Sequence, residues 1–167
     1  YLLNIAYMTL GEYPHRVPKK YLIDPTKKKK KIDYPRYTDI AAQLGLNTYS
    51  LAGGTVIDDF NNDGWLDIVV TSMGTKEELI LYINNGDGTF ADRTEAFGLK
   101  GHVAILNLNQ TDYNNDGWLD LFLMRGGWYK GQGDMPCTLL KNTGKGSFVD
   151  VTLKAGLTKY AASQTSA

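Results

Sequence analysis

The sequence predicts a mainly β protein made of β-propeller-type blades, with a short helix and a linker before them. Three observations carry this prediction. A segment of more than 50 residues is repeated, each repeat holds four short β-prone runs, and glycine- and asparagine-rich turn signals separate the runs. The composition agrees, since 18 glycines and 11 tyrosines in 167 residues suit a chain with many turns and strands.

The repeat is best seen in two pairs of matching residues. Asp59 corresponds to Asp112, 53 residues further on, and Phe90 corresponds to Phe148, 58 residues further on. The five extra residues fall in a glycine-rich stretch, 128–136, which we interpret as a loop insertion. Residues 37–46 resemble the ends of both copies, so the chain holds two full repeats preceded by the tail of another.

In the first repeat, the runs 55–58, 67–72, 79–84 and 89–94 are expected to form strands. The connections between them contain Asn-Asp-Gly at 62–64 and Asn-Gly-Asp-Gly at 85–88, which favour tight turns. Four short strands in a repeat of this length indicate one propeller blade.

These features divide the chain into segments. Residues 1–11 are expected to be helical, with Gly11 and Pro14 ending the helix, and residues 12–36 to be an extended linker. The expected domains are therefore a helix and basic linker (1–35), the repeats (36–157) and a polar tail (158–167). Within the repeats, 36–46 is the tail of a preceding blade, 50–99 is repeat 1 and 103–157 is repeat 2. Two blades cannot close a ring, so further blades or neighbouring chains are expected to cover the open sheet edges.

Charge and cysteine content exclude several classes of protein. The net charge is zero, but residues 1–50 carry nine Lys or Arg against four Asp or Glu, and residues 51–167 carry nine against fourteen. The basic excess lies mostly in the lysine run 27–31, which we interpret as a solvated linker and not as a nucleic-acid surface. Cys137 is the sole cysteine, so no disulfide forms within the chain.

No apolar run is long enough to span a membrane. Because the chain begins at Tyr1, we expect the true N-terminus to lie upstream.

The strongest chemical signal is a nine-residue acidic loop that occurs twice, at 59–67 and 112–120. Oxygen-bearing side chains stand at its positions 1, 3, 5 and 9, glycine stands at position 6, and the carbonyl of position 7 can also face an ion. Calcium prefers 6–8 oxygen ligands, so each loop is predicted to bind one Ca²⁺. The predicted ligands are Asp59, Asn61, Asp63, the Trp65 carbonyl and Asp67, and Asp112, Asn114, Asp116, the Trp118 carbonyl and Asp120.

Three other interpretations of the loops are weaker. An EF-hand would need glutamate at position 12 and flanking helices, but Val70 and Leu123 stand there within strand-like runs. Magnesium keeps several waters, and these loops offer many protein oxygens. Simple acidic turns would not require the same ligand spacing in both copies.

The loops resemble those of the FG-GAP/VCBS repeats, which are known from the propellers of integrin α-subunits and from many bacterial secreted proteins. The segments 84–90 and 142–148 resemble that family too, and the stretches at 2–14 and 51–54 resemble the ASPIC/UnbV (cartilage-acidic-protein-like) group. The resemblance implies a calcium-binding propeller with the ligands named above. The chain departs from that group because it has few blades and lacks a C-terminal ASPIC-type domain.

The expected function is a non-enzymatic, calcium-stabilised binding or adhesion scaffold outside the cytoplasm, where calcium is millimolar. The partner is left open between a protein and a glycan. Trp65 and Trp118 could stack on a sugar, but we expect them to pack between blades. No catalytic motif is found. The alternatives are an accessory part of a secreted enzyme and a structural subunit of an extracellular assembly.

Overall fold

The structure, a computed structural model, describes residues 2–23, 35–125 and 135–159. The chain forms two compact units, Tyr1–Thr38 and Asp39–Ala167. The lysine run 27–31 and most of the insertion at 128–136 lie outside the described residues.

The N-terminal unit contains one helix, α1 (Leu2–Thr9), as the sequence predicts. Gly11 follows it with a φ of 71°, a left-handed conformation that commonly ends helices. Asn4 is the buried residue of α1: its side-chain amide donates to the carbonyl of Tyr21, and its oxygen accepts from the backbone N–H of Ile23. Residues 12–23 are therefore not the extended linker that the sequence predicts, because turns bring them back onto the helix. In the described part of the chain, no helix has the length and apolarity that a membrane crossing requires.

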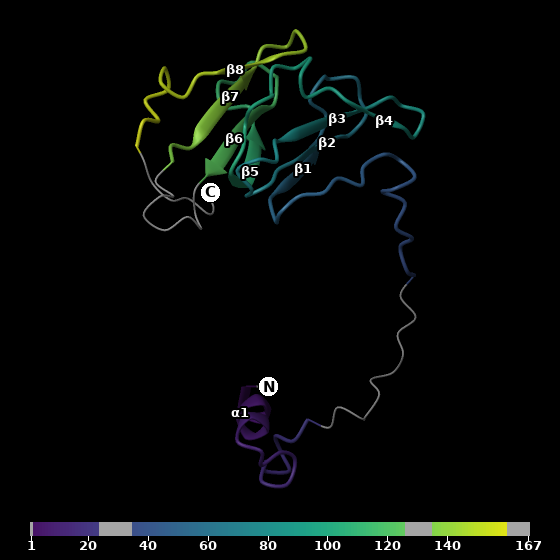
Figure 1. The fold of residues 1–167 in the computed structure, drawn as a ribbon, viewed down its shortest axis with the longest axis vertical. Helices are drawn as coiled ribbons and strands as arrows, with labels where there is room; N and C mark the ends of the chain where they lie inside the picture. The colour runs from purple at the N-terminus through teal and green to yellow at the C-terminus, as the bar shows by residue number, and fades with distance from the viewer. Residues whose placement is uncertain (1, 24–34, 126–134, 160–167) are drawn as a thin grey trace. The chain divides into compact units, whose positions relative to one another are not determined.

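The second unit holds two four-stranded antiparallel sheets of the propeller-blade type (Figure 1). In the first blade the strands follow the order β1-β2-β3-β4, and in the second β5-β6-β7-β8. Their bounds are β1 Thr55–Asp58, β2 Asp67–Val70, β3 Ile80–Asn84, β4 Phe90–Asp92, β5 Ile105–Thr111, β6 Asp120–Arg125, β7 Thr138–Asn142 and β8 Phe148–Asp150. All four strands predicted in the first repeat are confirmed, within one or two residues at their ends.

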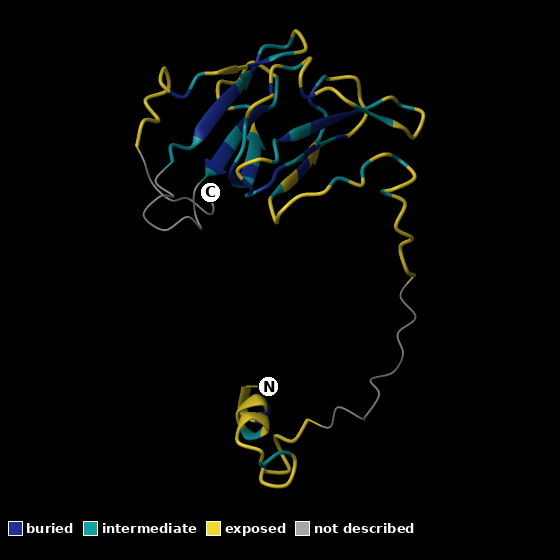
Figure 2. Ribbon diagram, in the orientation of Figure 1, coloured by how far each residue is buried: buried dark blue, intermediate teal, exposed yellow. Residues whose placement is uncertain are grey.

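The blades pack face to face, and each contributes a different face. The first blade turns the row Val56, Val69 and Leu81 toward the second blade. The second blade contributes Leu121 and Leu123 to the same core. In the repeat these residues correspond to Ile68 and Val70, which lie on the other face of the first blade, turned away from the second blade. Figure 2 shows the buried residues concentrated along the strands of both sheets. One core cluster thus spans both sheets, as expected for neighbouring blades of a stack.

The partial third copy has the conformation of the two full copies. A turn at 41–45 recurs at 94–98 and at 152–156. In each turn a leucine N–H donates to the carbonyl five residues earlier, which joins Leu46 to Ala41, Leu99 to Thr94 and Leu157 to Thr152. A glycine precedes each leucine, with φ between 71° and 74°. Residues 41–46 therefore fold like the end of a blade, as the repeat predicts.

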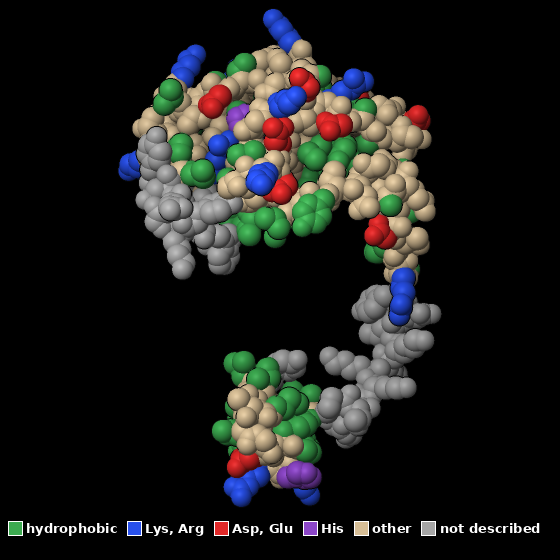
Figure 3. Space-filling model, viewed as in Figure 1, with side chains coloured by type: hydrophobic (Ala, Val, Ile, Leu, Met, Phe, Trp, Pro, Cys, Tyr) green, Lys and Arg blue, Asp and Glu red, His purple; other side chains and the backbone are tan. Residues whose placement is uncertain are grey.

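The outer face of the first blade is partly exposed. On the first blade, Ile57 is 55% exposed, and Ile68 and Val70 are only partly buried, whereas Leu121 and Leu123 are fully buried in the second. The space-filling view shows charged side chains of both signs interspersed with apolar ones on the visible face of the blades (Figure 3). The positions that the repeat uses for blade packing are thus available on the first blade for a further covering element.

Candidate metal centre

The two acidic loops have the same backbone conformation. Asn62 and Asn115, at position 4, both have a φ of 57°, and the glycines at position 6 have φ values of 89° and 85°. Asparagine and glycine tolerate this left-handed region better than other residues do. The loop between β1 and β2 and the loop between β5 and β6 therefore curl in the same way, as their shared sequence predicts.

The side chains at positions 1, 3 and 5 of the first loop make hydrogen bonds within the loop. The Asp59 carboxylate accepts the backbone N–H groups of Asp63 (3.1 Å) and Gly64 (2.7 Å). The Asn61 amide donates to Asp63 Oδ2 at 2.7 Å. The second loop repeats this pattern with Asp112, Asn114 and Asp116.

Position 9 differs because its carboxylate is fully buried. Asp67 accepts the N–H groups of Phe60 (3.0 Å) and Asn84 (2.8 Å), and Asp120 accepts those of Tyr113 (3.2 Å) and Asn142 (2.7 Å). Burial raises the pKa of both carboxyls, and the nearby carboxylates at positions 1 and 5 raise it further. Each loop thus gathers negative charge around a buried carboxylate.

This set of donors fits a hard divalent cation. Each loop carries three carboxylates and an amide oxygen, which are donors that calcium prefers, and a cation would relieve the repulsion between the carboxylates. In the arrangement described, the carboxylates are turned to loop N–H groups, and no three His, Cys, Asp or Glu side chains of the described residues are placed to hold a metal. Calcium binding would require the exposed side chains at positions 3 and 5 to turn inward. The calcium ligands remain predictions.

The first loop is also tied to the second blade. The Asn142 side chain, from β7, donates to the carbonyl of Phe60 at 2.9 Å, although the two residues are 82 positions apart. Asn62 donates to the carbonyl of Gly117 at 3.2 Å, which joins the two loops directly. Asn84 corresponds to Asn142 but donates to Leu66 in its own blade. The conformation of the first loop is therefore linked to the packing of the two blades.

Trp65, which the sequence predicts to pack between the blades, is 53% exposed, and both loop tryptophans contact turns of their own blades. The Trp65 ring lies over Gly86, and the Trp118 ring lies over Gly144, each in the turn that joins the last two strands of its own blade. A Cβ at Gly144 would stand 2.5 Å from the Trp118 ring, so the glycine is what lets the indole approach. Each ring therefore packs its own acidic loop against the turn between the third and fourth strands of the same blade.

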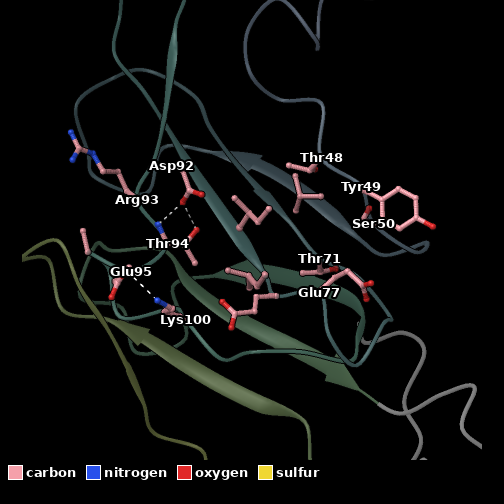
Figure 4. A pocket seen from close by; sticks show the side chains of 15 residues that line it. Thr48, Tyr49, Ser50, Thr71, Glu77, Asp92, Arg93, Thr94, Glu95 and Lys100 are labelled. Atoms are coloured by element: carbon pink, nitrogen blue, oxygen red, sulfur yellow. Dashed lines mark hydrogen bonds and ion pairs between the residues drawn. The ribbon is translucent and has the colours of Figure 1, made fainter.

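The first blade also carries an open hollow of about 920 Å³ (Figure 4). Its lining includes Val70 and Ile80, on the face turned away from the second blade. Two contacts involve charged groups of the hollow. Lys100 Nζ lies 3.2 Å from Glu95 Oε2, and the Asp92 carboxylate accepts from the N–H and the hydroxyl of Thr94. The described lining residues include no histidine or cysteine. The hollow therefore lies on the open face of the first blade, away from the second blade.

Comparison with known proteins supports the repeat. Residues 59–123 match the FG-GAP-like repeat, a span that begins at the first ligand position of the first loop and ends within β6. Such repeats are typically non-catalytic domains. No curated protein matches the chain. Residues 59–123 are thus similar to an FG-GAP-like repeat, and they lie within the two propeller-type blades.

Proposed function

We propose that the two loops bind calcium and that the chain is part of an extracytoplasmic binding or adhesion scaffold of the ASPIC/UnbV type. The proposal rests mainly on one observation. The two loops have the same spacing of oxygen-bearing residues and the same backbone conformation, and each ends in a fully buried carboxylate, that of Asp67 or Asp120. Binding of protein or glycan partners through exposed blade surfaces is the role that we assign to the scaffold.

The ions act structurally in this proposal. The first loop contacts the second blade through Asn142 and the second loop through Asn62. An ion that holds the loop closed would therefore also stabilise the packing of the blades. Extracellular modules bind calcium with dissociation constants of about 10⁻⁴–10⁻³ M, which suits a protein outside the cytoplasm.

Thermal unfolding with and without calcium tests this proposal. At a calcium concentration about 100 times the dissociation constant, binding stabilises the folded state by about 2.7 kcal/mol per site. We expect calcium to raise the melting temperature of the natural chain by several degrees. The Asp63→Ala/Asp116→Ala double variant should show no shift, because it lacks an exposed ligand in each loop.

Magnesium at the same concentration serves as the ionic-strength control and should produce a much smaller shift. If calcium and magnesium shift the melting temperature equally, or if the double variant responds to calcium as the natural chain does, the loops are not calcium sites.

A further inference from the structure

One ion pair distinguishes the two loops. Lys141 Nζ lies 2.8 Å from Oδ2 of Asp116, the position 5 carboxylate of the second loop. Both side chains are about one-third exposed. Asp63, the corresponding carboxylate of the first loop, accepts from the Asn61 amide and the Trp65 N–H, and the described residues place no cation against it.

The difference comes from one repeat position, which is isoleucine in the first blade. Ile83 lies opposite Ala91 in the β3–β4 pair, and Lys141 lies opposite Val149 in the β7–β8 pair. The residue after each is an asparagine whose N–H donates to the position 9 carboxylate. Ile83 and Lys141 therefore occupy equivalent positions beside their loops, with the same strand pairing and the same hydrogen bond from the asparagine that follows.

The blade stack explains why the two positions tolerate different residues. Ile83 belongs to the core between the two blades and is 9% exposed. Its equivalent in the second blade lies on the outer face, where a lysine can keep its ammonium group near solvent while its stem covers the sheet. From there the ammonium group reaches the acidic loop of its own blade.

A lysine in this position competes with a cation for the same carboxylate. Asp116 would have to leave Lys141 to coordinate calcium, or the ion would have to bind beside a positive charge, and both reduce affinity. Calcium binding to the first loop would neither break such an ion pair nor place the ion beside a lysine. The lysine also offsets part of the second loop's negative charge, so a calcium ion would relieve less repulsion in this loop than in the first.

We propose that Lys141 makes the two loops unequal, so that the first loop (59–67) is the stronger calcium site and the second loop (112–120) is held closed by the lysine and binds calcium more weakly. This inference rests on the proposed function, because it concerns the affinity of the same loops. Lys141 acts here as an affinity-determining residue and not as a ligand.

Calorimetric titration of the full chain with calcium tests the inference. We expect two unequal sites, with affinities that differ on the order of tenfold, as about 1.4 kcal/mol of charge competition would produce. Asp63→Ala should remove the stronger site, and Asp116→Ala the weaker one. Lys141→Met, which keeps an unbranched apolar stem, should strengthen the weaker site on the order of tenfold.

Lys145→Met is the matched control. Lys145 is exposed in the turn after β7, so this variant removes the same charge from the same hairpin without breaking the pair with Asp116. It should leave both affinities nearly unchanged. Lys141→Gln serves as a second neutral variant, and far-ultraviolet circular dichroism in calcium-free buffer should confirm that each variant is folded.

The outcomes separate this inference from the proposed function. Two equal sites in the natural chain, or a weaker site that is unaffected by both Lys141 variants, would overturn the inequality while calcium binding stands. Absence of calcium binding in the natural chain and in all variants would overturn both.

Discussion

Replacing Phe60 with alanine is expected to lower the free energy of unfolding by about 3–5 kcal/mol, the usual cost of truncating a buried phenylalanine. Phe60 is position 2 of the first loop, yet its side chain is only 1% exposed. Its ring packs edge-on against Phe148 of the second blade, with ring centroids 6.4 Å apart. Truncation would leave a cavity where the loop and both sheets meet, and urea unfolding in calcium-free buffer measures the loss.

Tyr113 provides a matched control because it holds the same position in the second loop. Its side chain is 42% exposed, so Tyr113→Ala should change the free energy of unfolding by less than about 1 kcal/mol. Equal losses in the two variants would contradict the packing of the first loop between the blades. The comparison thus tests whether the first loop, and not the second, packs between the two blades.

Replacing Asp67 with alanine is expected to lower the free energy of unfolding by about 2–5 kcal/mol without any calcium present. The variant leaves the buried N–H group of Phe60 and the partly buried N–H group of Asn84 without their acceptor, and each such loss costs about 1–3 kcal/mol. Removing a carboxyl whose pKa is raised by burial offsets part of that cost. The effect is again measured by urea unfolding.

Asp67→Asn and Asp63→Ala are the controls for this variant. The asparagine keeps one acceptor oxygen and should lose less stability than alanine does. Asp63 is exposed, and in calcium-free buffer its loss should cost under about 1 kcal/mol. If Asp67→Ala unfolds at the same urea concentration as the natural chain, the carboxylate does not organise the loop, and the structural role of position 9 is wrong.

Much of the blade could be predicted from the sequence because its signals are local. Strand alternation, the Asn-Asp-Gly turns and the spacing of the acidic loop depend on neighbouring residues, and the structure confirms the strands and the repeated turn. The partial copy at 37–46 was also detectable, since Gly45 and Leu46 recur as Gly98 and Leu99. Local chemistry therefore predicts the single blade well.

The differences between the two blades could not be predicted, because they depend on each blade's place in the stack. Phe60 and Tyr113 have equivalent loop positions, but only Phe60 meets a following blade. The ion pair of Lys141 depends on a strand pairing beyond the insertion at 128–136, far from the loop in sequence. The contacts of Trp65 and Trp118 with turn glycines of their own blades were missed because aromatic residues at repeat positions usually suggest packing between repeats.

Direct measurement of bound calcium tests the central claim, namely that the two acidic loops of this chain are calcium sites. The measurement is equilibrium dialysis of the natural chain and of the Asp63→Ala/Asp116→Ala variant against radioactive calcium, with excess magnesium present. We predict saturable binding that approaches two ions per natural chain, with dissociation constants of about 10⁻⁴–10⁻³ M for the stronger site, and none in the variant. Binding to the natural chain that does not exceed that of the variant at millimolar calcium would contradict the claim, and the loops would then be acidic turns held closed by their own amides.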